Sequence, residues 1–165
     1  MLNFKVLKAK NFLLRELNYS DTEELFLISS QIAIKYYIPG LYTNSIEDVN
    51  HIFTLGNLDN SLLLGIENSN KKIIGIIYAY INNNYDFAKI TYLLDPAEKG
   101  KGIMTEALKL FINYLYNYKI VNNVVFDVKV NNTASIHIMK KLNIPYSTDE
   151  DYLKFHLSLT EELPF

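Results

Sequence analysis

The residues with the clearest chemical potential lie in the stretch DPAEKGKGIMTEAL, residues 95–108. Two glycines and two lysines stand there, where an extended pattern gives way to a helical one. The first four backbone N–H groups of a helix have no partner within it, and the helix dipole places about half a positive charge beside them. Because Gly100 and Gly102 lack side chains, a pyrophosphate can approach these groups, and Lys99 and Lys101 add positive charge. The turn is a candidate pyrophosphate site, with glycines that only let the chain turn as the open alternative.

Spacing excludes two well-known phosphate motifs. The P-loop requires a glycine, four residues and then Gly-Lys-Ser/Thr, which this chain lacks. The dinucleotide fingerprint requires a third glycine where Thr105 stands, followed by a βαβ unit. A pyrophosphate at this turn would therefore belong to another kind of cofactor, one that runs on along the preceding strand.

Composition narrows the function classes further. The 165 residues include no cysteine, which excludes disulfides, thiolate zinc sites and a cysteine nucleophile. His51, His137 and His156 share no i, i+4 spacing, so no metal site is expected. A net charge of −2 argues against a nucleic-acid-binding protein. The most apolar run, residues 73–81, is too short to span a bilayer, and the N-terminus does not resemble a signal peptide. We expect one soluble, cytoplasmic domain over residues 1–165, with no membrane partner.

The elements around the glycine turn form a mixed pattern. Extended runs are predicted at residues 12–17, 61–68, 71–81, 85–95, 122–130 and 151–159, with a short additional strand near Tyr146 as a further option. Short polar turns separate the second, third and fourth runs, which predicts an antiparallel meander. Helices are predicted between the first and second runs and after residues 95 and 130. The resulting order, β-α-α-β-β-β-α-β-α-β, predicts an α/β (α+β) fold with a mixed, mostly antiparallel sheet flanked by helices.

Capping and breaking residues give the helix limits. Ser20 with Glu23 forms a capping-box pattern before apolar residues that continue at helical spacing to Ala33. Ser45 with Asp48 forms a second, weaker box before a helix that Gly56 closes. Further helices are predicted over residues 103–118, with one broad apolar stripe, and over residues 133–142.

In these motifs the chain resembles the GNAT acyltransferase superfamily. That family carries a Gln/Arg-x-x-Gly-x-Gly/Ala turn that binds the pyrophosphate of acetyl-CoA, and the corresponding window here is AEKGKG, residues 97–102. Both glycines match, whereas Ala97 replaces the leading Gln/Arg. In NNTASIHIMKKLN, Asn132 and Ser135 match the family's second motif, an asparagine followed three residues later by Ala or Ser. The start, LKAKNFLLREL and SDTEELF, resembles the branch of ribosomal-protein N-terminal acetyltransferases of the RimJ/RimL type.

The resemblance implies a GNAT-like three-layer fold and assigns candidate site residues. Backbone N–H groups of the fourth family strand, here residues 92–94, are expected to meet the oxyanion of the tetrahedral intermediate. The residues expected to bind acetyl-CoA are Tyr92, Leu93, Leu94, Lys99, Gly100, Lys101, Gly102, Ile103, Met104, Thr105, Asn132 and Ser135. No metal is expected in the site.

The proton donor for the leaving thiolate departs from the usual family pattern. Many family members place a tyrosine seven residues after the motif asparagine, where this chain has Met139, which cannot donate a proton. In the branch that the chain resembles, a serine at the Ser135 position is assigned this role, and Ser135 lies one helical turn before Met139. Ser135 is therefore the candidate catalytic residue, with a packing role as the alternative.

Other side chains receive no firm role. Glu67, His156 and a water chain are candidates for a general base, and His137 is expected at the surface. Tyrosines of the first interhelical loop are candidates for an acceptor cleft, with core or rim positions as the alternative. These tyrosines are Tyr36, Tyr37 and Tyr42.

The function implied by the resemblance is acetyl-CoA-dependent N-acetylation of a primary amine, on a protein N-terminus or a small molecule, by direct attack in a ternary complex. Acetyl-CoA and the amine are the expected partners of a monomer or homodimer. The alternative is a non-catalytic acyl-CoA-binding sensor or partner module. Ala97, Met139 and Asn143, which replaces the glycine usual at the end of the last helix, keep that alternative open. Asn143 is expected to take the left-handed conformation that glycine normally takes there.

Overall fold

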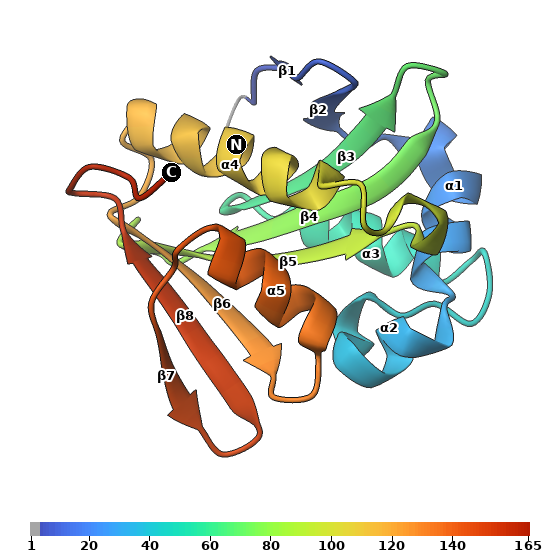
Figure 1. Cartoon of the computed structure of the whole chain (residues 1–165). Helices are drawn as coiled ribbons and strands as arrows, with labels where there is room; N and C mark the ends of the chain where they lie inside the picture. Colours follow the sequence, from blue (N-terminus) through green and yellow to red (C-terminus); the bar gives the residue numbers. More distant parts are fainter. Residues whose placement is uncertain (1–3) are drawn as a thin grey trace.

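The structure is a computed structural model that describes residues 4–165 (Figure 1). The first three residues of the predicted domain lie outside the described residues. The strands are β1 (Leu7–Lys8), β2 (Phe12–Glu16), β3 (Ser61–Asn68), β4 (Ile73–Ile81), β5 (Phe87–Leu94), β6 (Asn123–Lys129), β7 (Tyr146–Asp149) and β8 (Tyr152–Ser158). The α-helices are α1 (Thr22–Ser29), α2 (Ile32–Tyr37), α3 (Val49–Gly56), α4 (Ile103–Asn117) and α5 (Thr133–Lys141). Short 3-10 turns, η1 (Tyr19–Asp21), η2 (Pro39–Leu41) and η3 (Pro96–Glu98), precede α1, follow α2 and lie just before the glycine turn.

Within the described residues the strands form one eight-stranded sheet in the order β1-β2-β3-β4-β5-β6-β8-β7. Neighbouring strands run antiparallel except for β5 and β6, which are parallel. The predicted antiparallel meander of β3, β4 and β5 is confirmed, and so is the short strand at Tyr146. A short strand at Leu7–Lys8, which pairs with β2, was not predicted.

The parallel pair β5–β6 is short, and this decides where the site lies. Residues 87–89 pair with residues 123–125, and beyond them the two strands diverge. Strand β5 continues to Leu94 and β6 to Lys129, and Figure 1 shows the two strands separating. Their C-terminal halves therefore form the two sides of an opening in the sheet.

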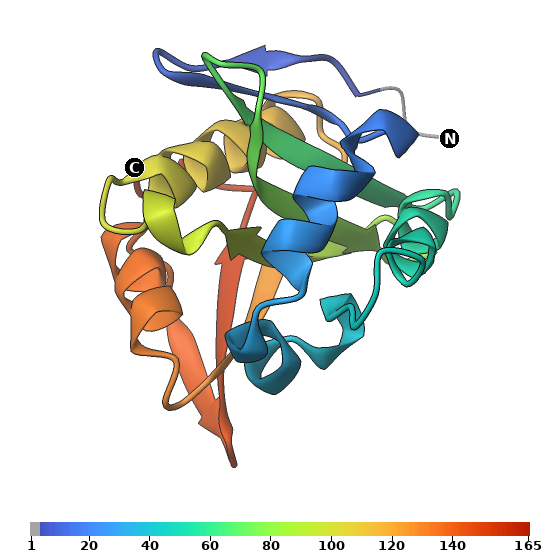
Figure 2. The ribbon, with the colours of Figure 1, turned by 90° about the vertical axis from the view of Figure 1, so that its right-hand side faces the viewer.

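Helices cover both faces of the sheet. Alternation along β3 places Leu62 and Leu64 in one core with residues of α4 and α5, and Leu63 in a second core with residues of α1 and α3. Figure 2 shows α1 lying across the sheet face that α4 and α5 leave free. The predicted mixed, three-layer arrangement is confirmed.

The first predicted helix differs from the observed one in its start and its length. The capping box is formed by Asn18, which accepts from Ser20 N–H, and Asp21, which accepts from Asn18 N–H, so the predicted Ser20–Glu23 box is wrong. Helix α1 ends at Ser29, because Gln31, two residues later, has an extended backbone conformation. The residues that follow form the separate helix α2.

The other capping predictions are partly correct. In the second predicted box, Asp48 accepts from Ser45 N–H at 3.0 Å, but α3 begins only at Val49. Asn143 has a φ of 52°, the left-handed conformation expected of it after the last helix.

Candidate active site

A pocket of about 500 Å³ lies at the C-terminal end of β5, beyond the last residue that pairs with β6. The end of β5, the glycine turn with the start of α4, and the N-terminal half of α5 form most of its wall, and residues at and around α2 close it on another side. From the predicted cofactor set it brings together Tyr92, Leu93, Leu94, Lys99, Gly100, Gly102, Ile103, Met104, Thr105, Asn132 and Ser135.

The glycine turn has the backbone geometry that a close phosphate contact requires. Gly100 and Gly102 have φ values of 80° and 77°, in the left-handed region that L side chains rarely adopt. A Cβ at either position would meet no protein atom within 4 Å, so the space beside the turn is open. Gly102 is the N-cap of α4 and offers no side chain to its first N–H groups. These groups, together with the dipole of α4, therefore suit a pyrophosphate.

The two lysines of the turn have different positions. Lys99 lines the pocket. Lys101 does not, because its ammonium group is 2.9 Å from Glu98 Oε2 in an exposed ion pair. In this structure Lys99 therefore lies at the pocket and Lys101 outside its lining.

The second motif forms the N-terminus of α5. Asn132 is the N-cap of α5, and its side-chain oxygen accepts a hydrogen bond of 3.2 Å from the N–H of Ser135. This bond explains the spacing of three residues between them, since an N-cap side chain reaches the N–H of the third helical residue. Asn132 therefore fixes the start of the helix that carries Ser135 into the pocket wall.

Met139 is not on the pocket face of α5. It is fully buried in the core between α4, α5 and the sheet, whereas Ile138 lines the pocket. Ser135 and Ile138 both line the pocket, whereas Met139, one helical turn after Ser135, packs into the core and does not line it. His137 is exposed as expected, but it also lines the pocket.

Tyr92 brings a phenol group to the pocket wall. Its ring packs edge-on against Phe126, with ring centroids 6.3 Å apart. Its oxygen is buried and makes no hydrogen bond of standard geometry, although the Ser135 hydroxyl lies near enough to interact with it. Burial raises the pKa of Tyr92 to about 12, an effect that the Ser135 hydroxyl partly offsets. An unsatisfied buried hydroxyl costs roughly 1–3 kcal/mol of stability.

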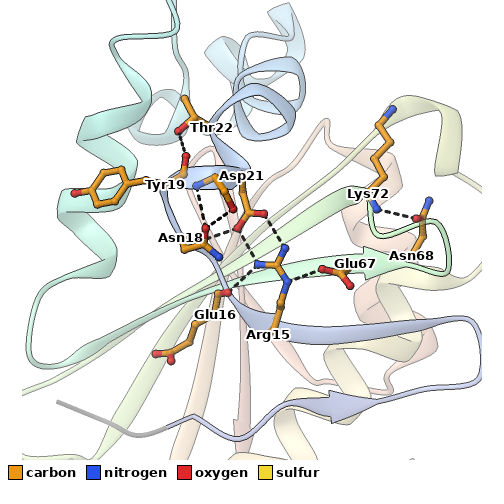
Figure 3. Close-up of polar contacts among 10 residues, drawn as sticks. Arg15, Glu16, Asn18, Tyr19, Asp21, Thr22, Glu67, Asn68 and Lys72 are labelled. Carbon is orange, nitrogen blue, oxygen red and sulfur yellow. Dashed lines mark hydrogen bonds and ion pairs between the residues drawn. The ribbon is translucent and has the colours of Figure 1, made fainter.

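The two candidate bases lie outside this pocket. Glu67 accepts a hydrogen bond of 2.6 Å from Nε of Arg15, which also pairs with Asp21 (Figure 3). His156 Nε2 lies 2.9 Å from the side-chain oxygen of Asn123. Neither side chain lines the pocket, and each has a structural partner instead.

The wall around α2 consists mostly of side chains for which no role was predicted. Its pocket-lining residues are Gln31, Ala33, Ile34, Tyr37 and Ile38. A buried hydrogen bond of 2.7 Å between the hydroxyls of Ser29 and Thr43 ties together the two ends of the segment that carries them.

Of the three tyrosines considered for an acceptor cleft, Tyr37 alone lines the main pocket. Tyr36 borders a separate cavity of about 190 Å³ and lies under the ammonium group of Lys129, 4.1 Å from the ring centroid. Tyr42 packs against Lys35. The α2 wall gave little signal in the sequence, because a short helix with no buried residue has no apolar periodicity to reveal its inner face.

The described residues include neither a metal-binding cluster nor a membrane-spanning helix. Residues 4–165 contain no group of three or more His, Asp or Glu side chains that could hold a metal ion. No helix in the same range is long and apolar enough to cross a bilayer.

The fold, the glycine turn at the start of α4 and the Asn132 cap agree with the resemblance to acyltransferases, and comparison with known proteins gives the family. Residues 11–144 match the acetyltransferase (GNAT) domain family, and the chain belongs to that family. A segment of 75 residues is 32% identical to the probable N-acetyltransferase YjcK of Bacillus subtilis (strain 168). The match covers 44% of this chain and 41% of that protein, so it spans less than half of the relative's length.

Solved structures of acetyltransferases share the fold over nearly the whole chain. Spermidine N-acetyltransferase from Vibrio cholerae, in complex with CoA and spermine, is similar with a TM-score of 0.81 and 15% identity, over 92% of this chain and 98% of that one. The ribosomal-protein-S5-alanine acetyltransferase of Vibrio fischeri is similar with a TM-score of 0.78 and 15% identity, over 98% and 100% of the two chains. At these identities the likeness demonstrates the fold alone.

Proposed function

We propose that this protein is an acetyl-CoA-dependent N-acetyltransferase that acetylates a primary amine, on a protein N-terminus or a small molecule, by direct attack in a ternary complex. The observation that carries the proposal is the pocket at the C-terminal end of β5, where the glycine turn, the start of α4 and the Asn132–Ser135 pair meet. We further propose that residues 1–165 act as one domain and that the protein acts in the cytoplasm, as a monomer or homodimer.

The turn provides the cofactor half of the proposed site. Backbone N–H groups at the start of α4 would hold the pyrophosphate, and Lys99 would add positive charge beside it. Residues 92–94 would bind along the pantetheine arm and offer backbone donors near the acyl group. Residues 92–94 still pair with β4 on one side, but they lie beyond the last pair of β5 with β6, so β6 does not use the N–H groups on the other side. Lys101 is left out of this proposed set, because Glu98 holds it outside the pocket.

In the proposed reaction, acetyl-CoA and the amine supply the reacting groups, and the protein supplies the groups that stabilise charge and deliver a proton. Acetyl-CoA supplies an activated acyl group. A bond forms between the amine nitrogen and the acetyl carbon, the carbon–sulfur bond breaks, the nitrogen gives up a proton and the sulfur gains one. Backbone N–H groups of β5 stabilise the oxyanion, a contribution of up to a few kcal/mol. Ser135, on the pocket wall, is the proposed group that delivers the proton to sulfur.

The amine must be neutral to attack. An α-amino group, with a pKa near 8, needs less help from a base than a lysine amine near 10.4. Glu67 and His156 are engaged elsewhere, so the proposed route for the amine proton runs through water in the pocket. This requirement favours acceptors whose amine has a low pKa.

The test is release of free thiol from acetyl-CoA with a panel of peptide N-termini, polyamines and aminoglycosides. We expect one acceptor class to give turnover that saturates with both substrates, and mass spectrometry to show one added acetyl group on the amine. The rival, a non-catalytic acyl-CoA-binding module, predicts that CoA binds while no amine releases thiol. Such a result across the whole panel would reject the proposed activity.

A further inference from the structure

The hydroxyl of Tyr92 has no structural explanation in the fold. Among the described residues, its oxygen is the one buried side-chain polar atom without a hydrogen-bond partner of standard geometry. The ring is already held by its contact with Phe126 and by the core around β5. A phenylalanine would make the same ring contacts without burying an unsatisfied hydroxyl, so the phenol oxygen lowers stability where it stands.

The position of this hydroxyl points to a role in the pocket. Tyr92 and Ser135 come from different elements, β5 and α5, and both line the same pocket. The Ser135 hydroxyl lies close to the phenol oxygen without a hydrogen bond of standard geometry, while the Ser135 backbone N–H donates to the Asn132 side chain. Asn132 thus fixes the backbone of Ser135, and the Ser135 hydroxyl lies beside the phenol of Tyr92.

From this arrangement we infer that Tyr92 is a positioning residue for Ser135, and that its phenol hydrogen-bonds to the Ser135 oxygen in the reacting complex. The inference rests on the proposed function. A serine whose oxygen accepts from Tyr92 must direct its own hydrogen elsewhere, and the leaving sulfur is the group that needs it.

Ser135, Tyr92, the acceptor amine and pocket water together account for every proton in the step. Ser135 passes its proton to the thiolate sulfur as the carbon–sulfur bond breaks, and the serine oxygen takes the phenol proton of Tyr92. The phenol then regains a proton that originates from the acceptor amine and travels through pocket water. Because burial raises the pKa of Tyr92 to about 12, the phenol is still protonated at neutral pH and able to donate.

The test compares Tyr92→Phe, Ser135→Ala and the double variant in steady-state kinetics with the best acceptor from the amine panel. We expect Tyr92→Phe to lower kcat roughly tenfold to a hundredfold, since a positioned acid contributes about a hundredfold or more and Tyr92 supplies part of that effect. The KM for acetyl-CoA should stay within about twofold, because the lost contact matters in the transition state. In the Ser135→Ala background, Tyr92→Phe should have no further effect, because Tyr92 acts through the serine.

Stability supplies a second readout that a purely structural role would not give. Without ligand, Tyr92→Phe should leave the melting temperature unchanged or raise it, because the hydroxyl that it removes has no partner. Tyr114→Phe is the matched control. Tyr114 is a buried tyrosine of the same core, on α4 and outside the pocket lining, so its loss should leave kcat unchanged.

Each contrary outcome has a distinct meaning. Full turnover in Tyr92→Phe, additive losses in the double variant or a lowered melting temperature would each overturn the inference while leaving the proposed function intact. If the wild-type protein itself releases no thiol with any amine, the proposed function fails and the inference fails with it.

Discussion

At the scale of single residues, Lys99 and Lys101 form a natural matched pair. They are two positions apart, carry the same charge and flank the same glycine, yet one lines the pocket and the other pairs with Glu98. We expect Lys99→Ala to weaken CoA binding roughly three- to tenfold, the effect of losing about 1 kcal/mol from one exposed charge near a phosphate. Lys101→Ala should change the affinity by less than about twofold. Isothermal titration calorimetry measures both.

Salt gives an independent check on Lys99. Screening weakens interactions between exposed charges, so the difference between wild-type and Lys99→Ala affinities should shrink as ionic strength rises. Equal losses in the two lysine variants would show instead that Lys101 leaves Glu98 when CoA binds.

At the scale of elements, the cluster of Arg15, Asp21 and Glu67 joins β2, β3 and the turn before α1 (Figure 3). Arg15 donates to both oxygens of Asp21, at 2.7 and 2.8 Å, and its Nε donates to Glu67 at 2.6 Å. Burial alone would raise the pKa of Asp21, but the bonds from Arg15 and from the Asn18 N–H outweigh it and hold the pKa below its usual range. Glu67, considered as a base, therefore belongs to a structural cluster.

This cluster predicts that part of the free energy of unfolding is lost in acid. Because the pKa of Asp21 is lower in the folded state, its contribution is complete above the unfolded pKa of about 3.9 and is lost as pH falls through the folded value. Asp21→Asn should lower the free energy of unfolding at neutral pH by about 1–3 kcal/mol, as expected for a hydrogen bond to a charged group. Its stability should also fall less steeply than that of the wild type between about pH 4 and pH 2. Urea unfolding across this range measures both effects.

Asp149→Asn is the control for the acid experiment. Asp149 pairs with Lys154 at an exposed position on β7 and β8, where ion pairs contribute little. We expect its effect at neutral pH to stay below about 0.5 kcal/mol. If Asp149→Asn lowered the free energy of unfolding as much as Asp21→Asn does, burial would not explain the contribution of the Arg15 cluster to stability.

At the scale of the whole molecule, the pocket draws on β5, α4, α5 and the α2 segment at once, so occupancy should stabilise the native state. A ligand at a hundred times its Kd adds about 2.7 kcal/mol, which raises the melting temperature of a chain this long by roughly 5–10 °C. We expect CoA to give such a shift in differential scanning fluorimetry. Pantetheine, which lacks the pyrophosphate, should give a much smaller one. The same shift with both compounds would mean that the glycine turn does not hold the pyrophosphate, and no shift with millimolar CoA would contradict acyl-CoA binding altogether.

The sequence by itself determined the features that depend on local patterns. The extended runs of β3 to β5 between short polar turns, the apolar stripe of α4 and the glycines of residues 100–102 predict their conformations, because turn chemistry, helical periodicity and left-handed φ are local properties. The spacing of Asn132 and Ser135 is local as well, since it is the geometry of a helix cap. These features carry most of the proposed cofactor site.

Only the tertiary structure decided which side chains share the pocket. Whether Ser135 is joined there by Met139 or by Ile138 depends on how α5 is rotated against the core, and packing with α4 and the sheet sets that rotation. The separation of Lys99 from Lys101 depends on Glu98, and the placement of the Tyr92 phenol beside Ser135 depends on where β5 and β6 part. Such contacts join residues that are far apart in the chain or fix the rotation of a helix about its own axis. No local pattern of residues encodes either property.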